Sequence, residues 1–106
     1  MKVEKIISIV DAVKTNSVND DTKLAWINDV EGRVACEIHK KSADEFKSLV
    51  NGEEELSIPE PYSRMYTLYL IAMIALVQGE FDLHSKAFTE YELAFSEYAR
   101  YSIRNK

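Results

Sequence analysis

IPEPYSRMYTLYLIAMIALV, residues 58–77, is the stretch that decides the predicted fold of this chain. Its two prolines forbid a helix through the entry but suit the first turn of one, so we expect a helix from near Pro61. The residues that follow are apolar on almost every side of that helix. They must be covered from several directions, by the rest of the fold or by neighbouring subunits. Gln78 and Gly79 provide the C-terminal stop.

A long amphipathic helix is predicted after this stop, from a cap at Asp82 to about Arg104. Its apolar stripe advances in steps of four and three, as in a coiled-coil seam. The stripe contains His84, Phe88, Tyr91, Phe95 and Tyr98, with Ala87, Ala94 and Tyr101 beside it. Because the link to the preceding helix is short, we expect the two helices to lie antiparallel as a helical hairpin.

Two shorter amphipathic helices are predicted in the N-terminal part of the chain. The first runs from Val3 to about Lys14, and the second runs from an N-cap within residues 19–22 to about Lys40. The apolar face of the second consists of Leu24, Ile27, Val30, Val34 and Ile38, with Trp26 beside it. Gly32 inside this helix costs roughly 1 kcal/mol relative to Ala. A close contact with a neighbouring helix would explain it, and so would a tolerated defect.

The helical pattern is lost in an insert at about residues 41–58. Asn51-Gly52 favours a tight turn, so residues 46–58 could form a small β-hairpin. The alternative is an exposed loop with a short helix from Ala43 to Val50. The sequence supports both interpretations equally. The predicted fold is a single all-α domain, residues 1–106, with four helices, a long antiparallel C-terminal helical hairpin and this irregular insert between its second and third helices.

Composition and charge restrict the partners of the protein. The chain is 46% hydrophobic and 29% charged, as in ordinary folded proteins, and its net charge of −5 disfavours a nucleic-acid backbone or an anionic membrane as the main partner. The apolar run 65–77 is shorter than the about 20 residues of a membrane-spanning helix. Cys36 is the only cysteine. It is expected to be a small buried residue in a reducing cytoplasm.

The sequence carries no catalytic, cofactor-binding or metal-binding signature. It lacks a nucleophile–base pair, a metal cluster and a glycine-rich phosphate loop, so we expect a protein that is not an enzyme and needs no cofactor. Glu80 and His84 lie four residues apart on a helix, but no second pair completes a metal site.

Aromatic residues are the candidates for packing or for interaction with a partner. A tyrosine buries an apolar ring and keeps a polar tip, which suits both a core and an interface. Core packing is the simpler interpretation for each residue taken alone. The set comprises Trp26, Tyr62, Tyr66, Tyr69, Phe88, Tyr91, Phe95, Tyr98 and Tyr101.

The combination of these features resembles a family of small proteins encoded in the head-and-tail structural gene blocks of tailed bacteriophages and prophages of Gram-positive bacteria. The matching pattern is Leu56-Ser57-Ile58-Pro59-Glu60-Pro61-Tyr62, then an apolar helix that ends in Gly79-Glu80, then an aromatic-rich last helix. The matching aromatic residues are Trp26, Tyr66, Tyr69, Phe95, Tyr98 and Tyr101. The resemblance covers most of the chain and leaves out residues 41–55.

The resemblance implies a virion protein that is assembled in the bacterial host cytoplasm, a head–tail connector or head-completion subunit. Its partners would be other copies of itself, in a ring, together with the portal and other head or tail proteins. The apolar helix near residues 61–77 fits a ring, since a heterologous ring buries two different faces of each subunit. We expect neither a membrane nor a specific nucleic-acid sequence as a partner.

Two alternatives accompany this interpretation. The first is a small helical adaptor or regulator that binds a partner helix in an apolar groove.

The second concerns the basic residues Arg100, Arg104 and Lys106 near the end of the last helix. Their interaction with the helix dipole is explanation enough, and a position facing packaged DNA is the weaker interpretation.

Overall fold

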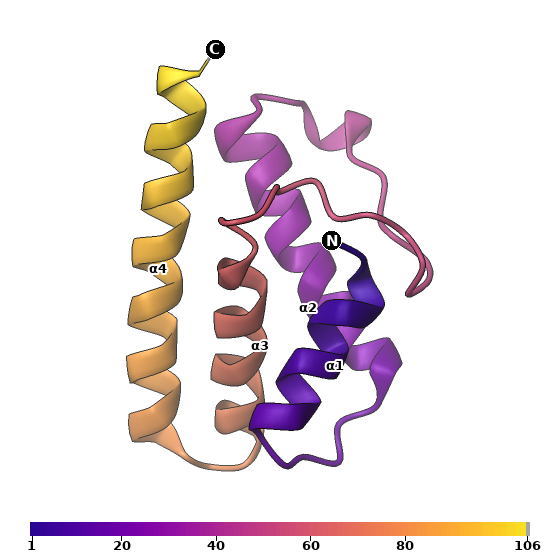
Figure 1. Ribbon diagram of the computed structural model, residues 1–106, viewed down its shortest axis with the longest axis vertical. Helices are drawn as coiled ribbons and strands as arrows, with labels where there is room; N and C mark the ends of the chain where they lie inside the picture. Colours follow the sequence, from indigo (N-terminus) through magenta and orange to yellow (C-terminus); the bar gives the residue numbers. More distant parts are fainter. Residues whose placement is uncertain (106) are drawn as a thin grey trace.

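The computed structural model describes residues 1–105, so Lys106 lies outside the described residues. Most of the described chain is helical, which confirms the all-α prediction (Figure 1). The helices are α1 (Val3–Val13), α2 (Asp20–Arg33), α3 (Arg64–Val77) and α4 (Phe81–Arg104). A π-helical turn, Val34–Ile38, continues α2, and a short 3₁₀ turn, Ala43–Glu45, follows it.

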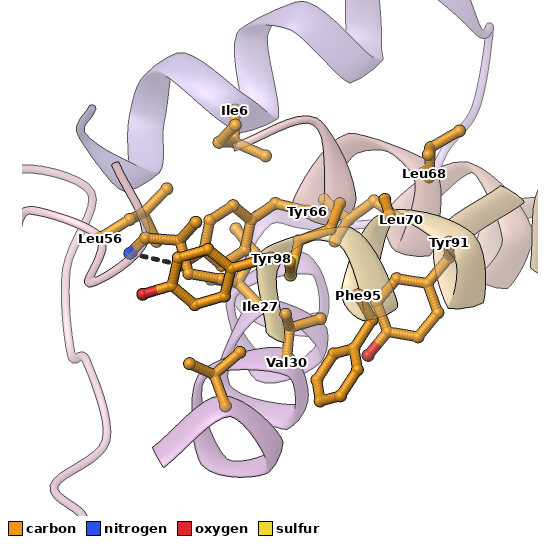
Figure 2. Close-up of a cluster of buried hydrophobic side chains, with 14 of the residues drawn as sticks. Ile6, Ile27, Val30, Leu56, Tyr66, Leu68, Leu70, Tyr91, Phe95 and Tyr98 are labelled. Atoms are coloured by element: carbon orange, nitrogen blue, oxygen red, sulfur yellow. Dashed lines mark hydrogen bonds between the residues drawn. The ribbon is translucent and has the colours of Figure 1, made fainter. Parts of the chain in front are cut away.

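α3 is the central helix of the fold. α1, α2 and α4 each pack against it, and α4 runs beside it in the opposite direction (Figure 1). Its fully buried side chains include Met65, Tyr66, Leu70 and Ile74. Figure 2 shows Ile6 of α1, Ile27 of α2 and Phe95 of α4 converging on the α3 side chains. The fold therefore covers most of α3 within one chain, and neighbouring subunits are not needed for that purpose.

Two helix boundaries follow the predicted signals. The side-chain oxygen of Asn19 accepts a hydrogen bond from the backbone N–H of Thr22 at 2.8 Å, which confirms an N-cap within residues 19–22. Gly79 has a φ of 76°, a left-handed conformation that glycine adopts at little cost, and it directly follows the end of α3.

Two other boundaries differ from the prediction. α3 begins at Arg64 and not near Pro61, because the carbonyl of Pro59 first accepts from the N–H of Tyr62 at 2.9 Å and forms a turn. α4 begins at Phe81, so Asp82 lies in its first turn and does not cap it. The first helical hydrogen bond there joins the N–H of His84 to the carbonyl of Glu80 at 2.9 Å.

The π-helical turn Val34–Ile38 ends close to the predicted helix end at Lys40. The N–H of His39 donates to the carbonyl of Val34 at 3.0 Å, and Lys40 leaves the helix with a φ of 58°. Cys36 lies on the outer side of this turn and is exposed. The expectation of a buried cysteine is therefore wrong, because the buried positions of the turn go to its aliphatic residues.

The insert is the predicted exposed loop and not a β-hairpin, with a helical part much shorter than the predicted Ala43–Val50. In the described chain, residues 41–58 contain no β-hairpin, and the helical part of the insert is limited to the 3₁₀ turn. Asn51-Gly52 does turn, as its sequence predicts, and the Glu54 carboxylate accepts from the N–H groups of Val50 and Asn51 at 2.7 and 3.1 Å. The chain beyond this turn pairs with α1 and not with the other arm of the insert.

The partner of the returning arm is the first turn of α1. The carbonyls of Glu54 and Gly52 accept from the N–H groups of Val3 and Glu4 at 3.0 and 2.9 Å. The first N–H groups of a helix have no partner inside the helix. The carbonyls of Glu54 and Gly52 accept from two of these N–H groups, which explains why the returning arm pairs with α1.

Candidate functional site

Most of the predicted aromatic residues line the contact between α3 and α4. Tyr69 of α3 packs against Phe88 and Tyr91 of α4, with its ring centroid 5.0 Å from that of Tyr91. Farther along α4, Tyr62 packs on Tyr98 and Tyr101 at 5.6 and 4.8 Å. These separations are typical of favourable aromatic pairs. The aromatic residues thus join the two long helices.

Burial divides the aromatic set. Tyr66, Tyr91, Phe95 and Tyr98 are buried, and Figure 2 shows them within the cluster of core side chains. Those that are half-buried are Trp26, Tyr62, Tyr69 and Tyr101. Phe88 is 36% exposed. Most of the set therefore packs inside the fold, and Phe88 presents the largest exposed fraction.

Glu31 is a buried carboxylate that the sequence analysis did not single out. It accepts a hydrogen bond from the hydroxyl of Tyr66, and the Ser57 hydroxyl and N–H donate to it at 3.0 and 3.3 Å. The N–H of Ile58 donates to the Tyr66 oxygen at 3.2 Å. Burial, with the nearby charge of Glu31, raises the pKa of Tyr66. These bonds tie the end of the insert to α2 and α3.

Arg33 forms a second polar link, between α2 and α4. Its guanidinium donates to both carboxylate oxygens of Glu92, at 2.7 and 3.2 Å, and lies over the Phe95 ring at 3.8 Å from the centroid. The hydrogen bonds to Glu92 raise the pKa of Arg33 above its ordinary value. A planar fork on a carboxylate combined with an aromatic face is a typical arginine arrangement. Arg33 is therefore committed to the fold.

Glu80 and His84, the weak metal candidates, are both occupied by other partners. Glu80 pairs with the Lys14 ammonium at 2.6 Å. The Nδ1 atom of His84 lies 2.8 Å from the carbonyl oxygen of Ala72. Among residues 1–105, no group of three His, Cys, Asp or Glu side chains is placed to hold a metal ion. None of the described helices has the length and apolarity needed to cross a membrane.

Exposed apolar side chains gather where α3 meets α4. The hydrogen bond from Gln78 to the Thr15 carbonyl, at 3.0 Å, brings the end of α1 to the same place. Val77 and Phe81 are each 64% exposed. We call this end the tip, and define it by Val13, Leu76, Val77, Phe81 and Leu83. Large apolar side chains clustered at the surface mark a candidate contact site.

A hollow of about 650 Å³ lies between α1, the start of α2 and the turn of the insert. Its apolar part consists of half-buried Ile7 and Leu24 with exposed Val50. The carboxylates around it belong to Glu4, Asp11, Asp20 and Asp21. We call this hollow the acidic groove. Among the described residues, no lysine or arginine lines it.

Comparison of this chain with protein-family models, with curated proteins and with solved structures found no match. The candidate sites are therefore judged on their geometry alone. The buried polar groups serve the fold, and the exposed features at this end of α1, α3 and α4 and beside the insert turn are the tip and the acidic groove.

Proposed function

We propose that this chain is a non-enzymatic assembly subunit of a tailed-phage virion, a head–tail connector or head-completion protein that acts by oligomerisation. The family rests on the sequence resemblance in residues 56–62 and in the two long helices. Oligomerisation likewise rests on that resemblance. Contact with a portal or another head protein is supported by one structural observation, the exposed apolar tip.

The tip contains the end of α3 and the start of α4, where the fold leaves apolar side chains uncovered. Most of α3 is buried by α1, α2 and α4, so the apolar character of this helix no longer argues for subunit contacts along its length. Leu76 and Val77 at its end are 41% and 64% exposed. Removing apolar surface of this kind from water contributes about 25 cal/mol per Å², from which the cost of association is subtracted. The tip is thus the place where a portal or another head protein would gain most from contact.

Light scattering across a concentration series tests the proposal. The purified protein is measured alone and with the portal protein encoded in the same gene block. A large closed oligomer, formed alone or only on the portal, supports a connector. A monomer or dimer that ignores the portal contradicts the connector and leaves the adaptor as the better interpretation.

A pair of tip variants makes the test specific. Val77→Ser with Phe81→Ser removes two apolar side chains that contribute little to the core, so the fold should change in stability by less than about 0.5 kcal/mol. Binding to the portal should fall at least about tenfold, because both side chains would leave the contact. Ala25→Ser, at an exposed position on α2 outside the tip, serves as the control. Unchanged portal binding in the tip variant would rule the tip out.

The acidic groove favours a second candidate function, the helical adaptor. An adaptor binds a segment of another protein in a groove, and this groove combines apolar side chains with carboxylates. The adaptor predicts a small discrete species in light scattering, with or without the portal. The same measurement therefore separates the two candidates.

A further inference from the structure

The outer face of α4 carries a basic apolar surface near its C-terminal end. Leu93 and Ile103 are 61% and 68% exposed, and Arg100 and Arg104 are exposed as well. Residues three, four and seven apart share one face of a helix. Leu93, Arg100, Ile103 and Arg104 therefore share one side of α4, and exposed Glu97 lies between them on the same side. This side carries two arginines and one glutamate, and we call it the basic face.

The acidic groove has the complementary chemistry. The Asp11 carboxylate is held by the buried Lys23 ammonium at 2.6 Å, and this hydrogen bond lowers the pKa of Asp11. The carboxylates of Glu4, Asp20 and Asp21 also face the groove, and within residues 1–105 the buried Lys23 ammonium pairs with Asp11 and not with them. Val50, 75% exposed, gives the groove an apolar contact for an aliphatic side chain. A helix that carries arginines beside leucine or isoleucine fits this combination.

The two surfaces lie on different sides of the molecule. In Figure 1 the end of α4 is remote from the insert turn at residues 50–52, which borders the groove. The basic face of one copy therefore cannot occupy the groove of the same copy. A contact between different patches of identical subunits is heterologous, and such contacts form closed rings or open filaments.

We infer that the basic face of α4 in one copy binds in the acidic groove of the next copy, head to tail. The inference rests on the proposed function in one respect, that the protein works by self-association. It assigns the tip to another protein and the basic face and groove to the subunit contact. The occupant is a second copy because this chain itself displays both halves of the charge complement, the arginines of the basic face and the carboxylates of the groove.

Charge reversal tests the contact. Arg100→Glu with Arg104→Glu gives a chain in which both surfaces are acidic. Asp20→Lys with Asp21→Lys gives a chain in which the face is basic and two groove carboxylates have become basic. Each variant alone should self-associate at least about tenfold more weakly, since two exposed ion pairs become repulsive.

Mixing the two variants supplies the decisive measurement. The reversed face of one fits the reversed groove of the other, and the two unaltered surfaces also fit each other. An equimolar mixture should therefore recover the mass and the concentration dependence of the original protein in light scattering. The recovered association should weaken as salt is raised, because exposed charges are screened.

Matched reversals elsewhere control for net charge and helix stability. Lys41→Glu with Lys47→Glu, at two exposed positions of the insert, changes the net charge as the arginine pair does. Asp44→Lys with Asp82→Lys matches the aspartate pair, and Asp82 lies in the first turn of a helix just as Asp20 and Asp21 do. All four lie outside the basic face and the groove. These controls should associate like the original protein.

The outcomes separate this inference from the proposed function. If the protein oligomerises and both reversal pairs leave the mass unchanged, the head-to-tail contact is wrong while the assembly function stands. If no oligomer forms alone or on the portal, the proposed assembly function is wrong. A weak contact between copies is then tested by the change in amide chemical shifts of labelled protein as its concentration is raised. Shifts at Ile7, Leu24 and Val50 that vanish in the arginine variant support a weak contact. Absence of those shifts, or equal shifts with an unrelated arginine-rich peptide, overturns a specific self-contact.

Discussion

α3 and α4 are held together by apolar and aromatic side chains at regular spacing, whereas the insert at residues 41–58 is held largely by single polar groups. In the first region many similar contacts contribute to stability. The ring centroids of Tyr69 and Tyr91 lie 5.0 Å apart, and those of Tyr62 and Tyr101 lie 4.8 Å apart. In the second region Glu31 fixes the segment at Ser57, and the side chain of Asn28 makes two bonds to the backbone of Leu49, at 2.8 and 3.0 Å.

The difference shows two ways of fixing a chain. Apolar contacts are not directional, so regular helices repeat them along their length. An irregular segment has no ladder of its own and must find partners for its backbone groups elsewhere. The regular region should therefore respond to loss of volume, and the insert should respond to loss of one donor or acceptor.

Ile74→Ala should have the largest effect, because it removes a fully buried side chain from the central helix. Leaving a cavity at such a site costs about 2–5 kcal/mol. Val77→Ala in the same helix is the control, since Val77 is 64% exposed. Urea denaturation followed by circular dichroism measures both. A similar loss in the two variants would contradict the central position of α3.

Tyr66→Phe should cost about 1–3 kcal/mol, because it leaves the buried Glu31 carboxylate and the N–H of Ile58 each without one partner. The ring stays, so the loss comes from polar groups alone. Tyr101→Phe is the control, at a half-buried tyrosine of α4. Hydrogen exchange should show the Ile58 amide exposed sooner in the first variant. Equal stability of the two variants would mean that Glu31 does not hold the insert.

Alkaline pH should weaken the fold through tyrosines of the helical core. Burial, with the charge of Asp29, raises the pKa of Tyr69 to about 12 from its ordinary value of 10.0. The folded state then binds the proton more tightly, so this contribution to stability is complete below pH 10.0 and is lost as the pH rises toward 12. Thermal unfolding across this range should show a gentler decline in Tyr69→Phe. An identical decline would assign the alkaline sensitivity to other groups.

Gly32→Ala should have the smallest effect and the opposite sign, a gain of up to about 1 kcal/mol. A Cβ atom at Gly32 would lie 3.5 Å from the Phe46 ring, an ordinary contact, so the glycine is a tolerated defect that faces the insert and not a neighbouring helix. Gly79→Ala is the contrasting variant, and it should lose about 1–2 kcal/mol because its φ is 76°. Thermal denaturation measures both, and a loss at Gly32 would show that Phe46 cannot adjust.

Much of the helical region was predictable because its signals are local and repeated. The apolar steps of three and four placed the helices, and Asn19 and Gly79 marked two of their ends. Asp82 failed as a cap because Glu80 already supplies the first helical carbonyl. Local signals thus gave the elements, with errors of one turn or less.

The buried charged residues of α2 could have been found from their spacing, although charged residues are usually expected at the surface. Glu31 lies four residues after Ile27 and Lys23 lies four residues before it, so both fall on the buried face of α2. A charged residue at such a position requires a partner, and the structure supplies Tyr66 and Asp11. Spacing alone therefore points to these residues, while their partners depend on the tertiary fold.

The insert and the candidate contact surfaces were less predictable for a different reason. The bonds of Asn28 to Leu49 and of Glu4 to Gly52 join positions far apart in the chain. The acidic groove likewise combines α1, α2 and the insert turn. Periodicity within one segment carries no information about such pairings, so only the assembled fold reveals them.

The first turn of α1 has a thermodynamic consequence for local opening. Its N–H groups at Val3 and Glu4 depend on the carbonyls of Glu54 and Gly52, and Lys2 at its N-cap makes no side-chain capping bond. The start of the helix and the returning arm of the insert therefore cannot open separately without exposing unpaired backbone groups. They form one cooperative unit of sub-global unfolding, in which amides distant in the chain exchange with solvent together.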